Sequence, residues 1–394
     1  SGNILKNLSF TTNVDQNYAN TTRPRFTAIL VEAGYYDITG NRFGSGDVDA
    51  STSPSISITA SGSTYSNYIG FIWENNTGVK IDNISENQMG GLKVSCNNLG
   101  NKNSPSTFST AIYTYSDYVK NIDNNTIGSL TVANNIYYTG VSPSNAYGFR
   151  GIYTYTSASG SPALSISGNT IANITMYVTG TLNSGIGNMA AIAYSSNSPA
   201  TVNNNTISGL STNFGTYTSN GFNGEIYGIL FSNSNNTVCS GNNIRLLNSL
   251  INTVHGITVS GYTTETYLTI SGNFISQLSA GYYIYGINST WATAGGNTIN
   301  NNIISIHRDV SQVTYGISNN NSVNLYYNSI YLSGTATGTN ATSCIILWNY
   351  DNTKPVILKN NILYNGRTRT SGSANNICLW LRVSTDGVTL DHNN

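Results

Sequence analysis

Short runs of alternating apolar and polar residues recur along the chain, and Asn, Gly and Ser separate them. Such alternation is typical of β-strands, and Asn and Gly tolerate the left-handed backbone angles of tight corners. One run reads Leu164-Ser-Ile-Ser-Gly-Asn169-Thr-Ile171, and another reads Leu268-Thr-Ile-Ser-Gly-Asn273-Phe-Ile275. The pattern therefore predicts an all-β chain of short strands joined by sharp corners.

Both runs follow one pattern, which we call the first phrase: apolar, any residue, apolar, polar, Gly or Asn, Asn, any residue, apolar. The first phrase repeats about every 26 to 44 residues. Related versions centre on Asn83, Asn125, Asn205, Asn242, Asn302, Asn328, Asn361 and Asn393. A second phrase precedes the first in each repeat, as in Ile226-Tyr-Gly-Ile229, Val254-His-Gly-Ile257, Ile284-Tyr-Gly-Ile287 and Thr314-Tyr-Gly-Ile317. Looser forms include Arg150-Gly-Ile152 and Ala190-Ala-Ile192. The constant order of two phrases indicates a repeat architecture.

A single repeat cannot bury its apolar face alone, but stacked repeats share a continuous core. Connections between parallel strands are almost always right-handed. We therefore expect residues 1–394 to form one continuous right-handed parallel β-helix, a β-solenoid of about ten or more coils. The structural alternative is a β-propeller, which would require antiparallel hairpins arranged in blades of about 40–45 residues.

With these phrases the chain resembles the right-handed parallel β-helix repeat family across residues 60–394. Its corners are similar to the asparagine ladders of that family, in which stacked amides bond from coil to coil. The ladder positions that this resemblance implies are Asn125, Asn169, Asn205, Asn242, Asn273, Asn302, Asn328 and Asn361. The composition, which is rich in Asn, Ser and Tyr and low in charge, is similar to that of large surface proteins that Bacteroidota export by type IX secretion. That resemblance implies an extracellular or cell-surface location.

Charge is scarce, and this excludes several classes of partner. Only 8% of residues are charged, and sixteen basic residues balance sixteen acidic ones. Nucleic-acid binding requires a basic patch, so we expect no nucleic-acid partner. No run approaches about 18 apolar residues, so we expect no transmembrane segment. Glycans or other surface proteins are the partners that fit an uncharged polar surface.

The two ends and residues 9–55 depart from the regular pattern. Ser1-Gly2-Asn3 already matches the repeat phrase, and Leu390-Asp-His-Asn393 lies inside another copy. Solenoids require capping repeats, so we expect a fragment with continuation of the same polypeptide at both ends. Residues 9–55 carry much of the charge and predict either an irregular coil or an insertion.

Candidate metal chemistry is confined to Asp47 and Asp49. Calcium takes six to eight oxygen ligands, so for an isolated Asp-x-Asp we favour a structural role of the two carboxylates over a calcium site. We expect no other cofactor. The four cysteines lack metal-ligand spacing. Cys239 and Cys378 lie where neighbouring repeats carry Ile, so we expect them to pack as small buried hydrophobic residues.

Candidate catalytic residues are equally few. Polygalacturonase-like enzymes of this fold use paired aspartates beside a His-Gly, but the chain has His255-Gly256 without an Asp-Asp pair. His255 also occupies the repeat position held by Tyr227 and Tyr285, which favours a place in an aromatic ladder. His307-Arg308-Asp309 and Asp391-His392 are isolated groups for which the sequence identifies no nucleophile. We therefore assign no catalytic residue.

The tyrosine pattern suggests a binding surface. Ile112-Tyr113-Thr114-Tyr115 recurs one coil later as Ile152-Tyr153-Thr154-Tyr155. With the isoleucines inside, alternation sends the tyrosines outward, and stacking sets Tyr113 on Tyr153 and Tyr115 on Tyr155. Such rings bind sugar faces or partner proteins, although cross-strand aromatic pairs also stabilise a sheet without any ligand.

Three functional hypotheses follow from the repeat and the missing chemistry. The first is a structural or adhesive stalk at the cell surface that presents a face to glycans or other cells. The second is a polysaccharide lyase or glycoside hydrolase with its site in residues 20–50 or on a loop. The third is a phage tailspike segment, which would be a stable homotrimer. The sequence favours the stalk and a non-enzymatic role.

Overall fold

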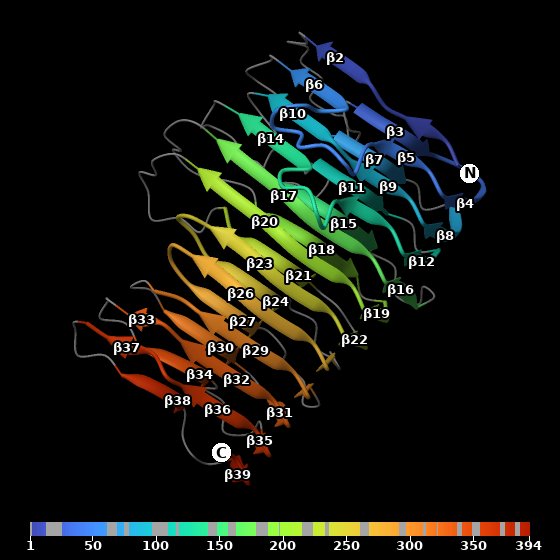
Figure 1. Ribbon diagram of the computed structural model, residues 1–394. Helices are drawn as coiled ribbons and strands as arrows, with labels where there is room; N and C mark the ends of the chain where they lie inside the picture. The colour runs from blue at the N-terminus through green and yellow to red at the C-terminus, as the bar shows by residue number, and fades with distance from the viewer. Residues whose placement is uncertain are drawn as a thin grey trace, which may run out of the picture.

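The computed structural model describes residues 2–12, 26–60, 69–74, 79–96, 109–115, 118–140, 148–156, 163–178, 188–196, 198–214, 224–232, 236–260, 268–290, 297–309, 313–320, 322–336, 341–348, 355–370, 375–382 and 387–394. Three long sheets run side by side through this part of the chain, and neighbouring strands in each come from successive coils (Figure 1). Every described strand pair is parallel, as in β17 with β20 and β21 with β24. The protein is thus a right-handed parallel β-helix, and the propeller alternative is wrong.

Each coil passes through sheet B, then sheet C, then sheet A. The strands of sheet B are β3 (Phe26–Val31), β7 (Ile69–Glu74), β11 (Ser109–Thr114), β15 (Phe149–Thr156), β18 (Met189–Ser196), β21 (Ile226–Ser232), β24 (Val254–Ser260), β27 (Ile284–Ser289), β30 (Thr314–Asn319), β34 (Thr342–Leu347) and β38 (Asn376–Leu381). The strands of sheet C are β4 (Tyr35–Thr39), β8 (Lys80–Ser85), β12 (Val119–Asp123), β16 (Leu164–Ser167), β19 (Ala200–Asn203), β22 (Thr237–Ser240), β25 (Leu268–Ser271), β28 (Thr298–Asn300), β31 (Val323–Tyr326), β35 (Val356–Lys359) and β39 (Val388–Asp391).

Sheet A is larger because its first part is doubled. Its strands are β1 (Ile4–Leu5), β2 (Leu8–Thr12), β5 (Arg42–Gly44), β6 (Ile56–Ala60), β9 (Gln88–Gly90), β10 (Leu92–Cys96), β13 (Thr126–Gly128), β14 (Ile136–Gly140), β17 (Thr170–Val178), β20 (Thr206–Phe214), β23 (Asn243–Ser249), β26 (Phe274–Ala280), β29 (Ile303–His307), β32 (Ser329–Ser333) and β36 (Ile362–Asn365). Strands β2, β6, β10 and β14 form a second branch, and the long strand β17 pairs with both β13 and β14. A small separate sheet pairs β33 (Thr335–Ala336) with β37 (Thr368–Arg369).

Residues 26–44 are part of the regular winding. They supply β3 to sheet B, β4 to sheet C and β5 to sheet A, each in parallel register with the following coil. The described strands of this stretch therefore belong to the three sheets of the solenoid. Residues 13–25 lie outside the described residues.

Columns of isoleucine fill the interior. Ile152 pairs with Ile192 and Ile192 with Ile229, and none of these side chains is exposed. Full burial of one such side chain contributes about 1.5–3 kcal/mol, so the stacked repeats stabilise one another through a shared core. The glycine of the Tyr-Gly-Ile phrase admits this packing, since a Cβ on Gly228 would lie 2.5 Å from the Gly256 carbonyl oxygen and 2.8 Å from a methyl carbon of Ile244.

An asparagine ladder closes the corner between sheets C and A, as the resemblance implied. Asn169 shows the pattern: its Nδ2 donates to Asn205 Oδ1 at 3.0 Å and to the carbonyl oxygen of Ile122 at 2.7 Å. Hydrogen bonds of this kind satisfy buried amides that would otherwise be costly. The ladder consists of Asn3, Asn41, Asn87, Asn125, Asn169, Asn205, Asn242, Asn273, Asn302, Asn328, Asn361 and Asn393.

One predicted repeat centre is wrong. Asn83 lies within β8, where its Oδ1 accepts from Asn121 at 3.0 Å, and the ladder position of that coil is Asn87. The residue before each ladder asparagine has a positive φ, and most are Gly or Asn. In this coil Glu86 takes the position, with φ of 57°. The usual Gly-Asn or Asn-Asn signal is therefore missing there.

The cysteines give a mixed outcome. Cys239 is fully buried, as expected, and burial raises the pKa of its thiol. Cys378 is exposed, so its expected burial is wrong; it lies on β38, the last strand of sheet B. Cys239, Cys344 and Cys378 are free. Among the described residues, no helix has the length and hydropathy of a membrane span.

Candidate binding face on sheet B

Two columns of side chains on sheet B pack outside the isoleucine core. In the first column, Tyr227, His255 and Tyr285 are register partners on β21, β24 and β27. In the second, Leu230, Thr258 and Asn288 take the equivalent positions three residues later. We call the two columns together the outer face of sheet B. It combines aromatic and polar side chains from successive coils, which is the combination found in ligand sites.

The four predicted tyrosines form the expected pairs: Tyr113 and Tyr153 lie in the second column, and Tyr115 and Tyr155 lie two residues farther along the chain. Tyr113 contacts Tyr153 with ring centroids 5.5 Å apart, and Tyr115 stacks on Tyr155 at 5.5 Å and 24°. Trp73 extends the first pair, 4.1 Å from Tyr113. However, Tyr113 and Tyr153 are only 2% and 6% exposed. These two rings therefore stabilise the sheet and offer no open platform, whereas Tyr115 and Tyr155 are half-buried.

A first hollow of about 230 Å³ opens beside these tyrosines. Register places Ala193 between Tyr153 and Leu230, and Ala190 between Arg150 and Tyr227. Ala193 lines the hollow, and its side chain fills far less space than those of Tyr153 and Leu230 on either side.

Arg150 lies against this hollow and is almost completely buried. Its Nη1 donates to the carbonyl oxygens of Asn188 at 2.5 Å and Phe149 at 3.3 Å. Burial lowers the pKa of Arg150 to about 10, so the guanidinium remains charged at neutral pH.

A second hollow, also of about 230 Å³, adjoins the first, since Leu230 lines both. His255 is held in it between two parallel rings, with centroids 4.6 Å from Tyr227 and 4.9 Å from Tyr285. This is the place in an aromatic ladder that its sequence position indicated. Burial lowers the pKa of His255 from 6.5 to about 3, so the imidazole is neutral at physiological pH.

Glu225 contributes the carboxyl group of this second hollow. It is 8% exposed, and the Tyr227 hydroxyl donates a hydrogen bond to it. Burial raises the pKa of Glu225, and the bond from Tyr227 partly opposes that shift. The hollow thus combines a neutral imidazole with a carboxyl group whose proton is held more tightly than usual.

Several buried polar atoms of the second hollow lack a hydrogen-bond partner within the described structure. They are His255 Nδ1 and Nε2, Thr258 Oγ1 and Asn288 Oδ1. Buried polar groups in native proteins are almost always satisfied by protein or by ordered water. These atoms form a small patch of unused donors and acceptors beside tyrosine faces. A ligand rich in hydroxyl groups has the matching chemistry.

The sequence did not single out Arg150, Glu225, Thr258 or Asn288 as site residues. The available signal was a charged residue in a repeat phrase, since Arg150 stands where other coils carry Tyr or His. The spatial neighbourhood of the two hollows depends on several coils at once, and the phrase alone does not show it.

Asp47 and Asp49 lie away from this face, in the turn after β5. Asp49 Oδ1 accepts from the Ser51 backbone nitrogen at 2.8 Å and from Ser51 Oγ at 2.6 Å. The hydrogen bond from the Ser51 side chain lowers the pKa of Asp49. The geometry is that of an Asx turn. Among the described residues, no group of three or more His, Cys, Asp or Glu is arranged to hold a metal ion.

Comparisons with known proteins identify no relative of this chain. No family model, no curated protein and no solved structure matches the chain. The parallel β-helix repeat architecture therefore rests on the strand register and the ladder themselves.

Proposed function

We propose that this chain is a rigid cell-surface stalk that binds glycans through the outer face of sheet B. The observation that carries the proposal is the second hollow, where unpartnered polar atoms of His255, Thr258 and Asn288 lie beside tyrosine rings. Sugars present hydroxyl groups for the polar atoms and apolar faces for the rings. A stiff rod of stacked coils supports this role because solenoids form extended binding surfaces.

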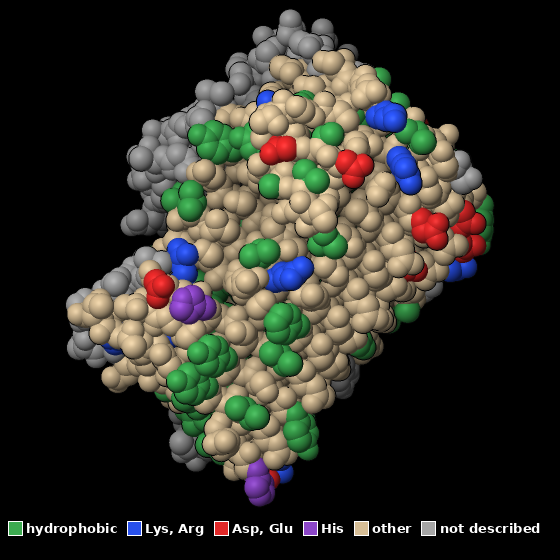
Figure 2. Space-filling model, viewed as in Figure 1, with side chains coloured by type: hydrophobic (Ala, Val, Ile, Leu, Met, Phe, Trp, Pro, Cys, Tyr) green, Lys and Arg blue, Asp and Glu red, His purple; other side chains and the backbone are tan. Residues whose placement is uncertain are grey.

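The sparse surface charge also supports uncharged recognition. Only 8% of the residues of the chain are charged, and the face of the rod formed by sheet A shows few acidic or basic groups (Figure 2). Neutral hydrogen bonds are screened little by salt. Glycan binding at the second hollow should therefore change little as ionic strength rises.

A degradative enzyme is the less favoured function. Glycoside hydrolysis generally uses two carboxylates about 5–10 Å apart. Among the described residues that line the two hollows, Glu225 is the single carboxylate. A screen for reducing sugars and unsaturated products would reverse this ranking if it showed turnover that Glu225→Gln abolishes. A stable homotrimer in solution would instead favour a tailspike segment.

The glycan proposal is tested by an array followed by titration calorimetry. The His255→Leu and Asn288→Ala variants each remove groups that would bond to the sugar. Each such bond is worth about 0.5–1.5 kcal/mol, so we expect binding to weaken about two- to tenfold. Tyr137→Ser is the matched control, because Tyr137 stacks on Tyr177 in sheet A, away from the hollow. Unchanged affinity in both His255→Leu and Asn288→Ala would show that the glycan binds elsewhere. If no glycan on the array bound, only a spacer role would remain.

Surface location is part of the same proposal. The composition rich in Asn, Ser and Tyr supports export. Immunolabelling of intact producing cells would test the surface location. Labelling seen only after lysis would contradict a surface stalk.

A further inference from the structure

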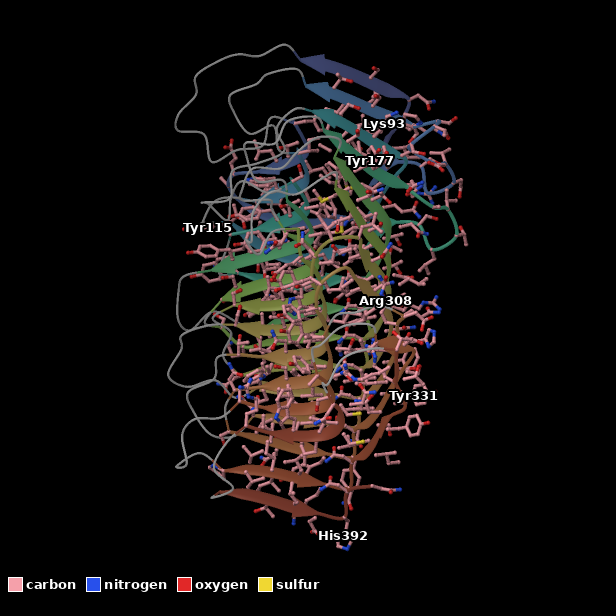
Figure 3. All side chains as sticks on the ribbon, turned by 90° about the vertical axis from the view of Figure 1, so that its left-hand side faces the viewer. Lys93, Tyr115, Tyr177, Arg308, Tyr331 and His392 are labelled. Atoms are coloured by element: carbon pink, nitrogen blue, oxygen red, sulfur yellow. The ribbon has the colours of Figure 1, made fainter. Side chains whose placement is uncertain are left out.

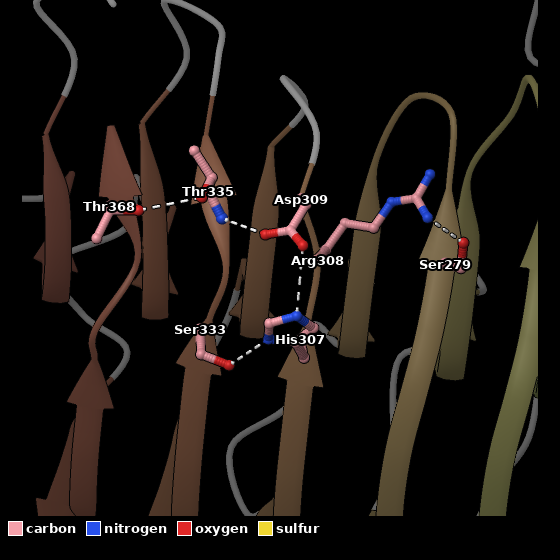
Figure 4. Close-up of polar contacts among 7 residues, drawn as sticks. All are labelled: Ser279, His307, Arg308, Asp309, Ser333, Thr335 and Thr368. Carbon is pink, nitrogen blue, oxygen red and sulfur yellow. Dashed lines mark hydrogen bonds and ion pairs between the residues drawn. The ribbon is translucent and has the colours of Figure 1, made fainter. Parts of the chain in front are cut away.

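We propose that Ser333, His307 and Asp309 form a site for acyl transfer from small carboxylic esters, on the outer side of sheet A. His307 ends β29 and Ser333 ends β32, and the two are register partners on adjacent strands. His307 Nδ1 lies 3.0 Å from Ser333 Oγ, and His307 Nε2 lies 3.5 Å from Asp309 Oδ2 (Figure 4). One imidazole thus contacts a hydroxyl on one side and a carboxylate on the other, which is the arrangement of a nucleophile, a base and an orienting group.

The carboxylate is held in place by its neighbours. Asp309 Oδ1 accepts a hydrogen bond from the backbone nitrogen of Thr335 at 2.8 Å. Thr335 Oγ1 in turn lies 3.2 Å from Thr368 Oγ1, on the next coil. Because a backbone group fixes one oxygen, the other is directed at His307. A carboxylate in this position favours the tautomer with its proton on Nε2 and leaves Nδ1 free to accept from Ser333.

Arg308 anchors the segment from the opposite direction. Its Nη1 donates to Ser279 Oγ at 2.5 Å (Figure 4). Its Nη2 donates to the Ala280 carbonyl oxygen at 3.3 Å, and both acceptors lie on β26 of the preceding coil. Residues 307–309 are therefore tied to the coil before and, through Ser333 and Thr335, to the coil after. This anchoring gives an exposed group of side chains a defined geometry.

A flat aromatic surface lies beside the group. Tyr331 precedes Ser333 by two residues on β32, so both side chains point to the same face of sheet A. Its ring stacks on that of Tyr364 at 5.1 Å and 4°, and the two side chains are 47% and 55% exposed. Tyr331 and Arg308 project from the same side of the rod (Figure 3). The stacked rings suit the flat alcohol portion of an ester, such as an aryl group or an acylated sugar.

The chemistry requires only the ester and water. Ser333 Oγ attacks the ester carbonyl carbon while His307 Nδ1 takes the hydroxyl proton. The bond from the carbonyl carbon to the alkoxy oxygen then breaks, and the alcohol leaves with the proton from His307. Water next attacks the acylated Ser333, again giving a proton to His307, and the carboxylic acid leaves as the serine hydroxyl is restored. Asp309 is a positioning residue that stabilises the imidazolium.

A fluorophosphonate probe tests the nucleophile directly. The full chain is incubated with the probe, and the adduct is located by peptide mass spectrometry; we expect it on Ser333. His307→Gln should slow labelling about 100-fold or more, the usual scale of general-base assistance. His392→Gln is the matched control, because His392 is also exposed and also pairs with a neighbouring carboxylate, that of Asp391. Labelling in this control should match the parent protein.

The positioning role of Asp309 has a separate readout. In the parent protein, labelling should fall at acidic pH because a protonated imidazole accepts no proton. Asp309→Asn should lower the labelling rate at least about tenfold and shift this pH profile to lower pH, since the imidazolium loses the carboxylate that stabilises it. The other charged groups near this site are Arg308, which is held against β26, and Arg367 and Arg369 of the following coil, since Arg367 interacts electrostatically with Asp309, Arg308 and Arg369.

Hydrolysis of p-nitrophenyl acetate separates serine chemistry from simple catalysis by an exposed imidazole. We expect a burst of p-nitrophenol equal to the protein concentration, followed by slower turnover, and loss of the burst in Ser333→Ala. All three side chains are surface groups, so unchanged thermal unfolding should show that each variant folds. Absence of a Ser333 adduct, or burst-free hydrolysis that persists in Ser333→Ala, would overturn the proposal and leave a surface hydrogen bond between two coils.

Discussion

Asn169 donates two hydrogen bonds to one oxygen of Asn205, from its backbone nitrogen at 2.9 Å and from its side-chain nitrogen at 3.0 Å. The Asn205 amide meanwhile donates to the Ile166 carbonyl oxygen and to Asn242 Oδ1. A single side chain therefore satisfies buried groups on both neighbouring coils. The ladder is a continuous structural element, and its members cannot be replaced independently.

Replacing Asn205 with Ala should lower the free energy of unfolding by at least about 3 kcal/mol, because each buried polar group left without a partner costs about 1–3 kcal/mol. Asn121→Ala is the matched control, since Asn121 Nδ2 bonds to Asn83 Oδ1 in a half-exposed column and should cost less than about 1 kcal/mol. Chemical denaturation measures both. Equal losses in the two variants would contradict the special role of the buried ladder.

Tyr327 should be a site where substitution stabilises the protein. It precedes ladder residue Asn328 with φ of 57°, and its side chain is 59% exposed. The left-handed conformation costs most residues about 1–2 kcal/mol, and Asn tolerates it better. Tyr327→Asn should therefore raise the free energy of unfolding by about 1 kcal/mol. The same substitution at Tyr326, on strand β31, should bring no gain.

Gly256→Ala should destabilise the stack. Its Cβ would lie 2.5 Å from the Gly286 carbonyl oxygen and 2.8 Å from a methyl carbon of Ile275. Overpacking of this kind costs about 1–3 kcal/mol. At Gly46, by contrast, a Cβ would meet no atom within 4 Å, so Gly46→Ala is the control. Thermal unfolding should show a lower midpoint for the first variant and little change for the second.

His255 should make stability depend on pH. Its pKa is about 3 in the folded protein and 6.5 ordinarily, so the unfolded chain binds the additional proton between these values. Stability is therefore lost as the pH falls through this window. From pH 7 to pH 5 the loss due to this group is about 2 kcal/mol. His255→Leu should lose less stability than the parent over the same step, and parallel losses measured by chemical denaturation would contradict this account.

The corners and the core follow from local sequence, whereas the hollows do not. A Gly-Asn or Asn-Asn pair marks a left-handed residue and then a ladder amide, and both are properties of adjacent positions. The signal fails at Asn87 because Glu86 adopts the left-handed angle without the usual residue type. Likewise, the repeat predicts that Tyr113 pairs with Tyr153, but it does not predict that both rings are buried.

Contacts between coils depend on loop lengths that vary from one repeat to the next. Ser333 lies 26 residues after His307, a separation that has no meaning until the strands are aligned. The hollow beside Arg150 likewise depends on Ala193, which lies between the larger side chains of Tyr153 and Leu230 on the coils on either side. Sequence patterns within one repeat do not contain this information.

From Asn3 to Asn361, each side-chain amide of the asparagine ladder is oriented the same way, with one of its N–H groups donated to the ladder oxygen of the coil that follows. The small dipoles of these groups consequently add along the axis of the rod and do not cancel. A column of this kind is electrically asymmetric from one end to the other, although the chain carries no net charge.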